Sequence, residues 1–366
     1  MASNRFQPIL IAGLLPLLVF TWFGRDYIGQ IDFWLLWLVA MTLVGLPLVF
    51  AEIGLAHRSG TSPLIGLAKL TREADVATAW RGFGWLTVGL LLVVIGHLLA
   101  SSGQMLQPLM GQMALPAMLA VMTLGVLGLS FAKHLAGWLA VGFGIAAIAM
   151  NVASRGMVDW QVTQTSLSEW SMAVVLALVC VGAGTGLFFF FFTHQMLSDE
   201  VTAEASGASA REAASRYVLP VWCFQLVAGA LIAMTMAPNS SLSAIFNALA
   251  MLAGAAYLLH VVTHQVALRF QQQSFNFLVL VVLAVVSLLL AMVPTPWLNQ
   301  LIAMLSLVTA MWLSVFTGWQ MKISHLRKSM NFSSESLYNL WRIAVRILVP
   351  LAVAIAIVGW LLGLAQ

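Results

Sequence analysis

Two ionisable side chains lie within long apolar segments and are the first candidates for chemistry. Glu52 ends the stretch Gly45-Leu46-Pro47-Leu48-Val49-Phe50-Ala51-Glu52, and His97 lies within Gly96-His97-Leu98. An ionisable group inside a membrane is costly, so it is usually paired or functional. Glu52 is therefore a candidate for a hydrogen-bond network, with a side chain that reaches the interface as the alternative. His97 could bind an anionic group or carry a proton near neutral pH, with a packed histidine bonded to a carbonyl as the alternative.

Two further histidines and two cysteines could in principle hold a metal. His260 and His264 are one helical turn apart on one face, which is also a metal-ligand spacing. No third ligand lies near them in the sequence, so packing or placement at the interface is favoured. Cys180 and Cys223 both lie in apolar runs and indicate small core residues. We expect no metal site.

Two apolar runs contain residues that interrupt a helix. Gly13 and Pro16 lie in the first run, and Gly182-Ala183-Gly184-Thr185-Gly186 lies in the sixth. Proline removes a backbone donor and clashes with the preceding turn, while glycines lower helix stability. Secondary transporters place their binding sites at such interrupted helices. A kink with a packing face of small residues is the alternative in both runs.

These residues must be positioned by helices that cross a membrane. The chain has 366 residues, of which 61% are hydrophobic and 8% charged, whereas soluble domains carry about 25% charged residues. Long continuous apolar runs favour helices over a transmembrane barrel, because a barrel shows short alternating segments. About eleven runs have the length that a bilayer requires, roughly 17–25 residues. They lie near 8–24, 33–56, 83–107, 114–132, 135–152, 170–194, 217–237, 243–268, 275–293, 297–319 and 341–363.

The positions of the basic residues indicate an orientation and exclude nucleic acid as the reason for the net charge of +4. If the N-terminus is cytoplasmic, Arg25 and Arg155 are the only ones of the 16 Lys and Arg residues on the outer side. Such a bias is the positive-inside rule. We therefore expect a multi-pass protein of the cell (inner) membrane with a cytoplasmic N-terminus. An amphipathic piece near 64–70 should lie along the inner face.

Several motifs resemble the neurotransmitter:sodium symporter family, the family of the bacterial leucine transporter. They run through most of the chain in the order of the family: Asn4-Arg5-Phe6, residues 45–52, Arg58-Ser59-Gly60, Ser62-Pro63, Gly184-Thr185-Gly186 before Ser198-Asp199, Leu226-Val227-Ala228-Gly229, and Trp341-Arg342-Ile343 with Arg346 and Pro350. The resemblance implies an all-α polytopic membrane protein with a 5+5 inverted repeat and one extra C-terminal helix. Residues 1–366 would form a single domain, with repeat one at about 8–152, repeat two at about 170–319 and the extra helix at about 341–363.

The sequence departs from the family where sodium is held. The glycines and the asparagine of the family's span 1 are missing from residues 17–24, and the adjacent hydroxyl residues of its span 8 are replaced by Ala255-Ala256-Tyr257-Leu258. Val94 or Ile95 replaces a tyrosine of span 3, and Gly182 replaces a serine of span 6. Hard cations need several oxygen ligands. We therefore expect no cofactor, and proton coupling through His97 or no ion coupling instead of sodium coupling.

The sequence predicts a carrier, not an enzyme, for a small organic solute such as an amino acid or an amine. By position and resemblance, the substrate-binding residues would be Pro16, Leu17, Thr21, His97, Gly182, Gly184, Thr185, Gly186 and Tyr257. The gate and network residues would be Arg25, Glu52 and Arg5, where Arg25 resembles an outer-gate arginine and Arg5 an inner one.

Other functions and partners stay open at this stage. The main alternative is a non-transporting membrane subunit, sensor or accessory protein that kept the fold. A weaker one is an enzyme acting on lipid next to Glu52 or His97. The expected partners are the lipid bilayer and the solute, without nucleic acid, and a homo-oligomer or a partner membrane subunit is an open alternative.

Overall fold

The computed structural model describes residues 11, 13–111, 113–155, 159–189, 215–235, 240–270, 276–332 and 334–364. Within these ranges the regular structure is helical, and the one extended pairing is an isolated parallel bridge between Gln30 and Gln161. The expected all-α fold class is confirmed.

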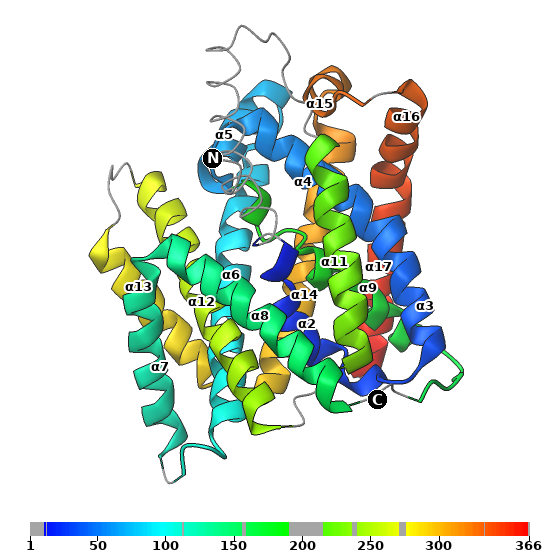
Figure 1. Ribbon diagram of the computed structural model, residues 1–366. Helices are drawn as coiled ribbons and strands as arrows, with labels where there is room; N and C mark the ends of the chain where they lie inside the picture. The colour runs from blue at the N-terminus through cyan, green and yellow to red at the C-terminus, as the bar shows by residue number, and fades with distance from the viewer. Residues whose placement is uncertain are drawn as a thin grey trace, which may run out of the picture.

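Each expected apolar run contains observed helices, in the same order along the chain (Figure 1). The first five runs and their connections hold α2 (Leu17–Phe23), η1 (Arg25–Tyr27), α3 (Ile31–Ala40), η2 (Met41–Gly45), α4 (Leu46–Ser59), α5 (Pro63–Ala74), η3 (Thr78–Arg81), α6 (Gly82–Leu106), α7 (Leu115–Ser130) and α8 (Lys133–Arg155). The remaining runs hold α9 (Leu167–Val181), α11 (Ser215–Thr235), α12 (Ser241–Arg269), α13 (Phe277–Ala291), α14 (Thr295–Val315), η4 (Phe316–Gln320), α15 (Ile323–Met330), α16 (Glu335–Ile343), η5 (Ala344–Leu348) and α17 (Val349–Leu364). The symmetry between the two repeats stays a prediction.

The described helices have the length and composition of membrane spans. Seven of them, several joined end to end as in Ile31–Ser59, are long and apolar enough to cross a bilayer. Leu115–Ser130, Leu167–Val181 and Phe277–Ala291 are shorter apolar helices. Large apolar side chains such as Leu124, at 68% exposure, remain uncovered. Lipid is the solvent that such a surface requires, so the chain is a multi-pass membrane protein.

Two helix groups surround the centre of the molecule. In one, α12 packs against α6, α7 and α8, and α6 also contacts α13 and α14. In the other, α9 packs against α3 and α17 (Figure 1). The first span lies between the two groups, since α2 contacts α6 and α12 on one side and α9 and α11 on the other.

One end of the bundle is rich in basic residues. Basic residues gather on α5, η3, α15 and the neighbouring ends of α4 and α16, which we call the basic end: Arg58, Lys69, Arg72, Arg81, Lys322, Arg327, Lys328 and Arg342. In Figure 1 this is the upper end. The positive-inside rule would place it in the cytoplasm. That orientation stays a prediction.

Two π-helical turns interrupt described helices, η2 between α3 and α4 and η5 between α16 and α17, and a third, η4, ends α14. A π turn holds one residue more than an α turn and is frequent at functional sites. Indole donors reach two of these turns. The indole N–H of Trp222 donates to the carbonyl of Met41 at 3.0 Å, and that of Trp319 donates to the carbonyl of Arg346 at 3.1 Å.

Small residues allow the spans to approach closely, as is common in membrane helices. A Cβ at Gly359 of α17 would lie 2.8 Å from the carbonyl oxygen of Leu167 in α9 and closer still to the hydroxyl of Ser171. The backbone atom cannot give way as a flexible side chain could. Glycine at position 359 therefore permits the close contact between α17 and α9.

We expect Gly359→Ala to destabilise the folded protein by about 1–3 kcal/mol, because the added methyl group overpacks the contact with α9. Gly125→Ala is the matched control, since a Cβ there meets nothing within 4 Å, and it should stay within about 0.5 kcal/mol of wild type. Thermal unfolding in detergent measures both. Equal melting temperatures for the two variants would contradict the close contact.

Candidate functional site

The sixth span is interrupted in the middle of the protein. α9 ends at Val181, and Gly182, Gly184 and Gly186 then adopt φ of 63°, 75° and 71°. Residues that carry a side chain rarely adopt this left-handed backbone conformation, so glycine at each position permits the break. The N–H of Ala183 donates to the carbonyl of Leu178 at 3.1 Å, which closes the end of the helix.

A buried carboxylate holds the backbone of this break. The N–H of Gly184 donates to Oε2 of Glu52 and the N–H of Gly186 donates to Oε1, both at 2.9 Å. Glu52 comes from α4 and is 0% exposed. Two peptide donors that no helix satisfies therefore bond to a carboxyl group that is shielded from solvent. Glu52 thus lies in a hydrogen-bond network with the break, and its role as a network residue of a transporter stays a prediction.

The carbonyl at the start of the break is also bonded internally. The hydroxyl of Thr185 donates to the carbonyl of Gly182 at 2.6 Å. A Cβ at Gly184 would clash with Thr309 of α14, so the break packs tightly against that helix. The unwound segment is thus a defined structure in which the N–H groups of Gly184 and Gly186 and the carbonyl of Gly182 are paired, not a loose loop.

The first span is kinked, not unwound, over its described residues. Pro16 has φ −61° and ψ −33°, which are helical values. Hydrogen bonds from Leu18 N to Leu15 O at 3.2 Å and from Val19 N to Pro16 O at 3.3 Å tighten the chain locally to a 3₁₀ turn. The alternative considered for this run, a kink with packing of small residues, describes what the structure shows.

The two interrupted spans meet at a small central cavity. A Cβ at Gly182 would lie 2.8 Å from Cγ of Pro16, so the glycine allows the two spans to touch. Beside this contact lies a cavity of about 30 Å³, lined by Leu15, Pro16, Val19, Leu90, Leu91, Val94, Leu178, Val179, Gly182, Ala183, Thr185, Leu187, Leu258, Ile302 and Ser306. A single water occupies about this volume. An amino acid does not fit in this conformation.

Three of the expected substrate-binding residues, Pro16, Gly182 and Thr185, line the cavity. Gly184 and Gly186 are not among the lining residues, and their N–H groups donate to Glu52. Leu17 is buried in the core outside the cavity lining. The side chains of Thr21 and Arg25, and all of Arg5, lie outside the described part of the chain. As site residues, all of these stay predictions.

His97 and Tyr257 are buried but do not line the cavity. His97 Nδ1 lies 3.4 Å from the hydroxyl of Ser101 within α6, and its side chain also interacts with Asn299 of α14. The ring of Tyr257 lies against Gly137 of α8. His97 therefore links α6 to α14 in a polar cluster outside the cavity.

Apolar side chains stand at the positions that the resemblance compared with sodium ligands, and the absence of sodium binding stays a prediction. Ala255 and Ala256 are fully buried, and Leu18 packs so closely on Gly254 that a Cβ there would lie 2.4 Å from Leu18 Cδ1. These side chains offer no oxygen ligand. No group of three His, Cys, Asp or Glu that could hold a metal occurs among the described residues.

Ser306 and Ile302 of α14 line the cavity and were missed in the sequence. They lie on one helix face with Thr309, at spacings of four and three residues. The recurrence of Ser306 and Thr309 on one face of an apolar span was the available signal. Ser306 is, with Thr185, one of the two polar side chains of the lining.

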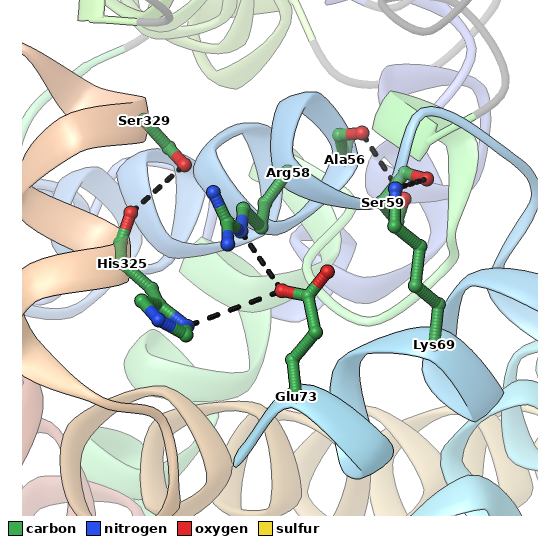
Figure 2. Close-up of polar contacts among 7 residues, drawn as sticks. All are labelled: Ala56, Arg58, Ser59, Lys69, Glu73, His325 and Ser329. Atoms are coloured by element: carbon green, nitrogen blue, oxygen red, sulfur yellow. Dashed lines mark hydrogen bonds and ion pairs between the residues drawn. The ribbon is translucent and has the colours of Figure 1, made fainter.

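A second polar cluster lies at the basic end, away from the cavity. Figure 2 shows Glu73 of α5 between Arg58 of α4 and His325 of α15. Nε of Arg58 lies 2.9 Å from Oε2 of Glu73, and Nδ1 of His325 lies 3.9 Å from the same oxygen. Lys69 donates to the carbonyl of Ser59 at 3.3 Å. The cluster ties α4, α5 and α15 together.

The fold is that of known transporters. MhsT, solved in complex with L-phenylalanine, matches with a TM-score of 0.65 and 16% identity over 97% of this chain and 98% of that one. Mhp1, a nucleobase-cation-symport-1 family transporter solved in a closed conformation with bromovinylhydantoin bound, matches with a TM-score of 0.55 and 15% identity over 98% and 90%. No protein-family model and no curated protein matches the sequence.

Both neighbours have the leucine-transporter fold, so the fold that the resemblance implied is confirmed. This chain is a divergent polytopic membrane protein of that fold. Its neighbours are transporters, not enzymes.

We expect Glu52→Gln to destabilise the protein by about 1–3 kcal/mol, because the amide presents a donor where one peptide N–H needs an acceptor. Glu335→Gln is the control, since Glu335 is 66% exposed and should change stability by less than about 1 kcal/mol. Thermal unfolding of the purified variants is the measurement. A Glu52→Gln protein as stable as wild type would show that the carboxylate does not hold the break.

Proposed function

We propose that this protein is a secondary transporter that carries a small, largely apolar organic solute, such as an amino acid or an amine, by alternating access. The observation that carries the proposal is the break at 182–186, where Gly182 and Thr185 face a central cavity while Glu52 holds the backbone behind them. Interrupted helices around a central site are the common plan of such carriers. The names of MhsT and Mhp1, with their bound organic molecules, add support.

The lining of the cavity suggests the character of the solute. Most lining side chains are aliphatic, with Leu91, Val94 and Ile302 as examples, and none is charged. Thr185 and Ser306 are the polar side chains. An apolar body would pack against the aliphatic wall, and a polar end would bond to these hydroxyls and to the backbone of the break.

A cavity of about 30 Å³ holds about one water, so the solute must bind in a conformation with a wider centre. The contact between Pro16 and Gly182 is where the two interrupted spans would separate. Hinges of this kind use a few residues that absorb a local change in backbone angles. The structure described would then be a closed state.

The alternative function is a non-transporting membrane subunit or sensor. The observation in its favour is the packing of the centre, where Leu15 and Leu18 fit against Gly254 and the buried side chains of Ala255 and Ala256 offer no oxygen. Such a protein would keep the broken helix as part of its architecture. Binding and uptake measurements separate the two functions.

We expect the full chain, reconstituted in liposomes, to take up at least one solute from a panel of radiolabelled apolar amino acids and amines. Val94→Phe adds bulk inside the cavity and should lower uptake about tenfold or more, because overpacking costs about 1–3 kcal/mol. Ser306→Ala removes a polar group without adding volume and should weaken binding of the same solute. The control is Leu124→Phe, at a side chain that is 68% exposed to lipid.

Uptake by the control at the wild-type level, with both cavity variants impaired but folded, is the expected pattern. If no solute of the panel binds or is taken up, the carrier proposal fails and the non-transporting alternative stands. If Val94→Phe and Leu124→Phe behave alike, the solute does not use this cavity.

We also expect solute binding to be independent of sodium. Replacing sodium with choline should change the dissociation constant by less than about twofold, because Ala255 and Ala256 provide no side-chain oxygen where a hard cation would need several. Equilibrium binding in the two salts at equal ionic strength measures this. A tenfold or larger tightening in sodium would contradict it.

A further inference from the structure

An open pocket at the basic end is separate from the central cavity. It has a volume of about 940 Å³ and lies where η4, α15 and η5 meet. Four of its lining side chains are cations: Lys322, Arg327, Lys328 and Arg346. The indole of Trp319 and the amide of Asn331 also line the pocket.

Two π-helical turns fix one of these cations in place. Nε of Arg346 in η5 donates to the carbonyl of Gly318 in η4. Its guanidinium lies 5.5 Å from the ring centroid of Trp319, whose indole N–H donates to the Arg346 carbonyl at 3.1 Å. A Cβ at Gly318 would lie 3.0 Å from Arg346 Cγ, so glycine permits this approach. The guanidinium is therefore held in the pocket wall before any ligand arrives.

The charge of the pocket is only partly balanced. Within the described part of the chain, the acid paired with one of the four cations is Glu335, 3.2 Å from Arg327. Both partners of this pair are more than half exposed, so it is weak. Lys322, Lys328 and Arg346 leave a net positive site, and phosphate is the anion that such a mixture of Lys and Arg suits.

The surface beside the pocket is apolar and open. Trp319 is 60% exposed, and Leu340, Ile343 and Ile347 on α16 and η5 are 66%, 57% and 59% exposed. Tryptophan is enriched at the boundary between water and lipid. A phosphate bound in the pocket would therefore lie next to a surface suited to acyl chains.

We propose that this pocket binds the phosphate headgroup of an anionic phospholipid, whose chains lie along the apolar side of α16 and η5. Clusters of Lys and Arg next to a membrane span attract anionic lipid, by about fivefold in affinity per cation. The adjoining apolar surface favours a lipid over free phosphate as the ligand. The site is independent of the solute that the centre carries.

The test uses the full chain in nanodiscs of phosphatidylcholine, with or without a fraction of phosphatidylglycerol. Melting temperature and retained phosphatidylglycerol, counted by native mass spectrometry, are the readouts. The pocket variant is Lys322→Gln with Lys328→Gln. The matched control is Arg72→Gln with Arg269→Gln, which removes the same charge from exposed positions outside the pocket.

We expect phosphatidylglycerol to raise the melting temperature of wild type and control, and the pocket variant to lose about 25-fold in lipid affinity. Equal losses in the control and the pocket variant would overturn the proposal, because the effect would then be one of overall charge. A third arm adds inorganic phosphate to discs without phosphatidylglycerol. Stabilisation there as large as with the lipid would overturn the assignment to a phospholipid.

Discussion

The structure depends on satisfying peptide groups that leave a helix in the middle of a membrane. No water is available there to take the place of a lost helical bond. Glu52 provides two acceptors to the N–H groups of Gly184 and Gly186, and the Thr185 hydroxyl donates to the carbonyl of Gly182. The carboxyl oxygens of Glu52 gain the hydrogen-bond partners that a buried polar group requires. The break in the sixth span and the buried acid in the second therefore explain each other.

Much of the fold could be predicted from the sequence because bilayer thickness sets a length that apolar runs must meet. The helix Gly82–Leu106 falls almost where the run near 83–107 was expected, and Ser241–Arg269 contains the run near 243–268. The π turns could not be predicted in this way. Their presence at Met41–Gly45 and Phe316–Gln320 depends on contacts between distant spans, which local composition does not carry.

The site was predictable only in part. Three glycines in five residues predicted the break, because their backbone freedom is a local property. Which side chains face the centre is instead set by how helices rotate against one another. His97 lies in the expected span, but its side chain interacts with Asn299. Ser306 faces the cavity from a helix for which the sequence predicted no site residue. Pro16 suggested unwinding, yet the packing of the first span keeps it helical.

The π turn η2 means that the second span contains one residue more than a regular α-helix of the same course would need. A π turn arises when one residue is added to an α-helix without shifting the chain beyond it. Removing a residue from 41–45 would restore the α pattern and leave Glu52 in register, whereas a deletion closer to the acid would rotate its carboxylate by about 100°. Insertions and deletions among distant relatives should therefore gather at this turn. The turn would allow the length of α3 to vary among relatives while the hydrogen bonds between Glu52 and the sixth span are kept.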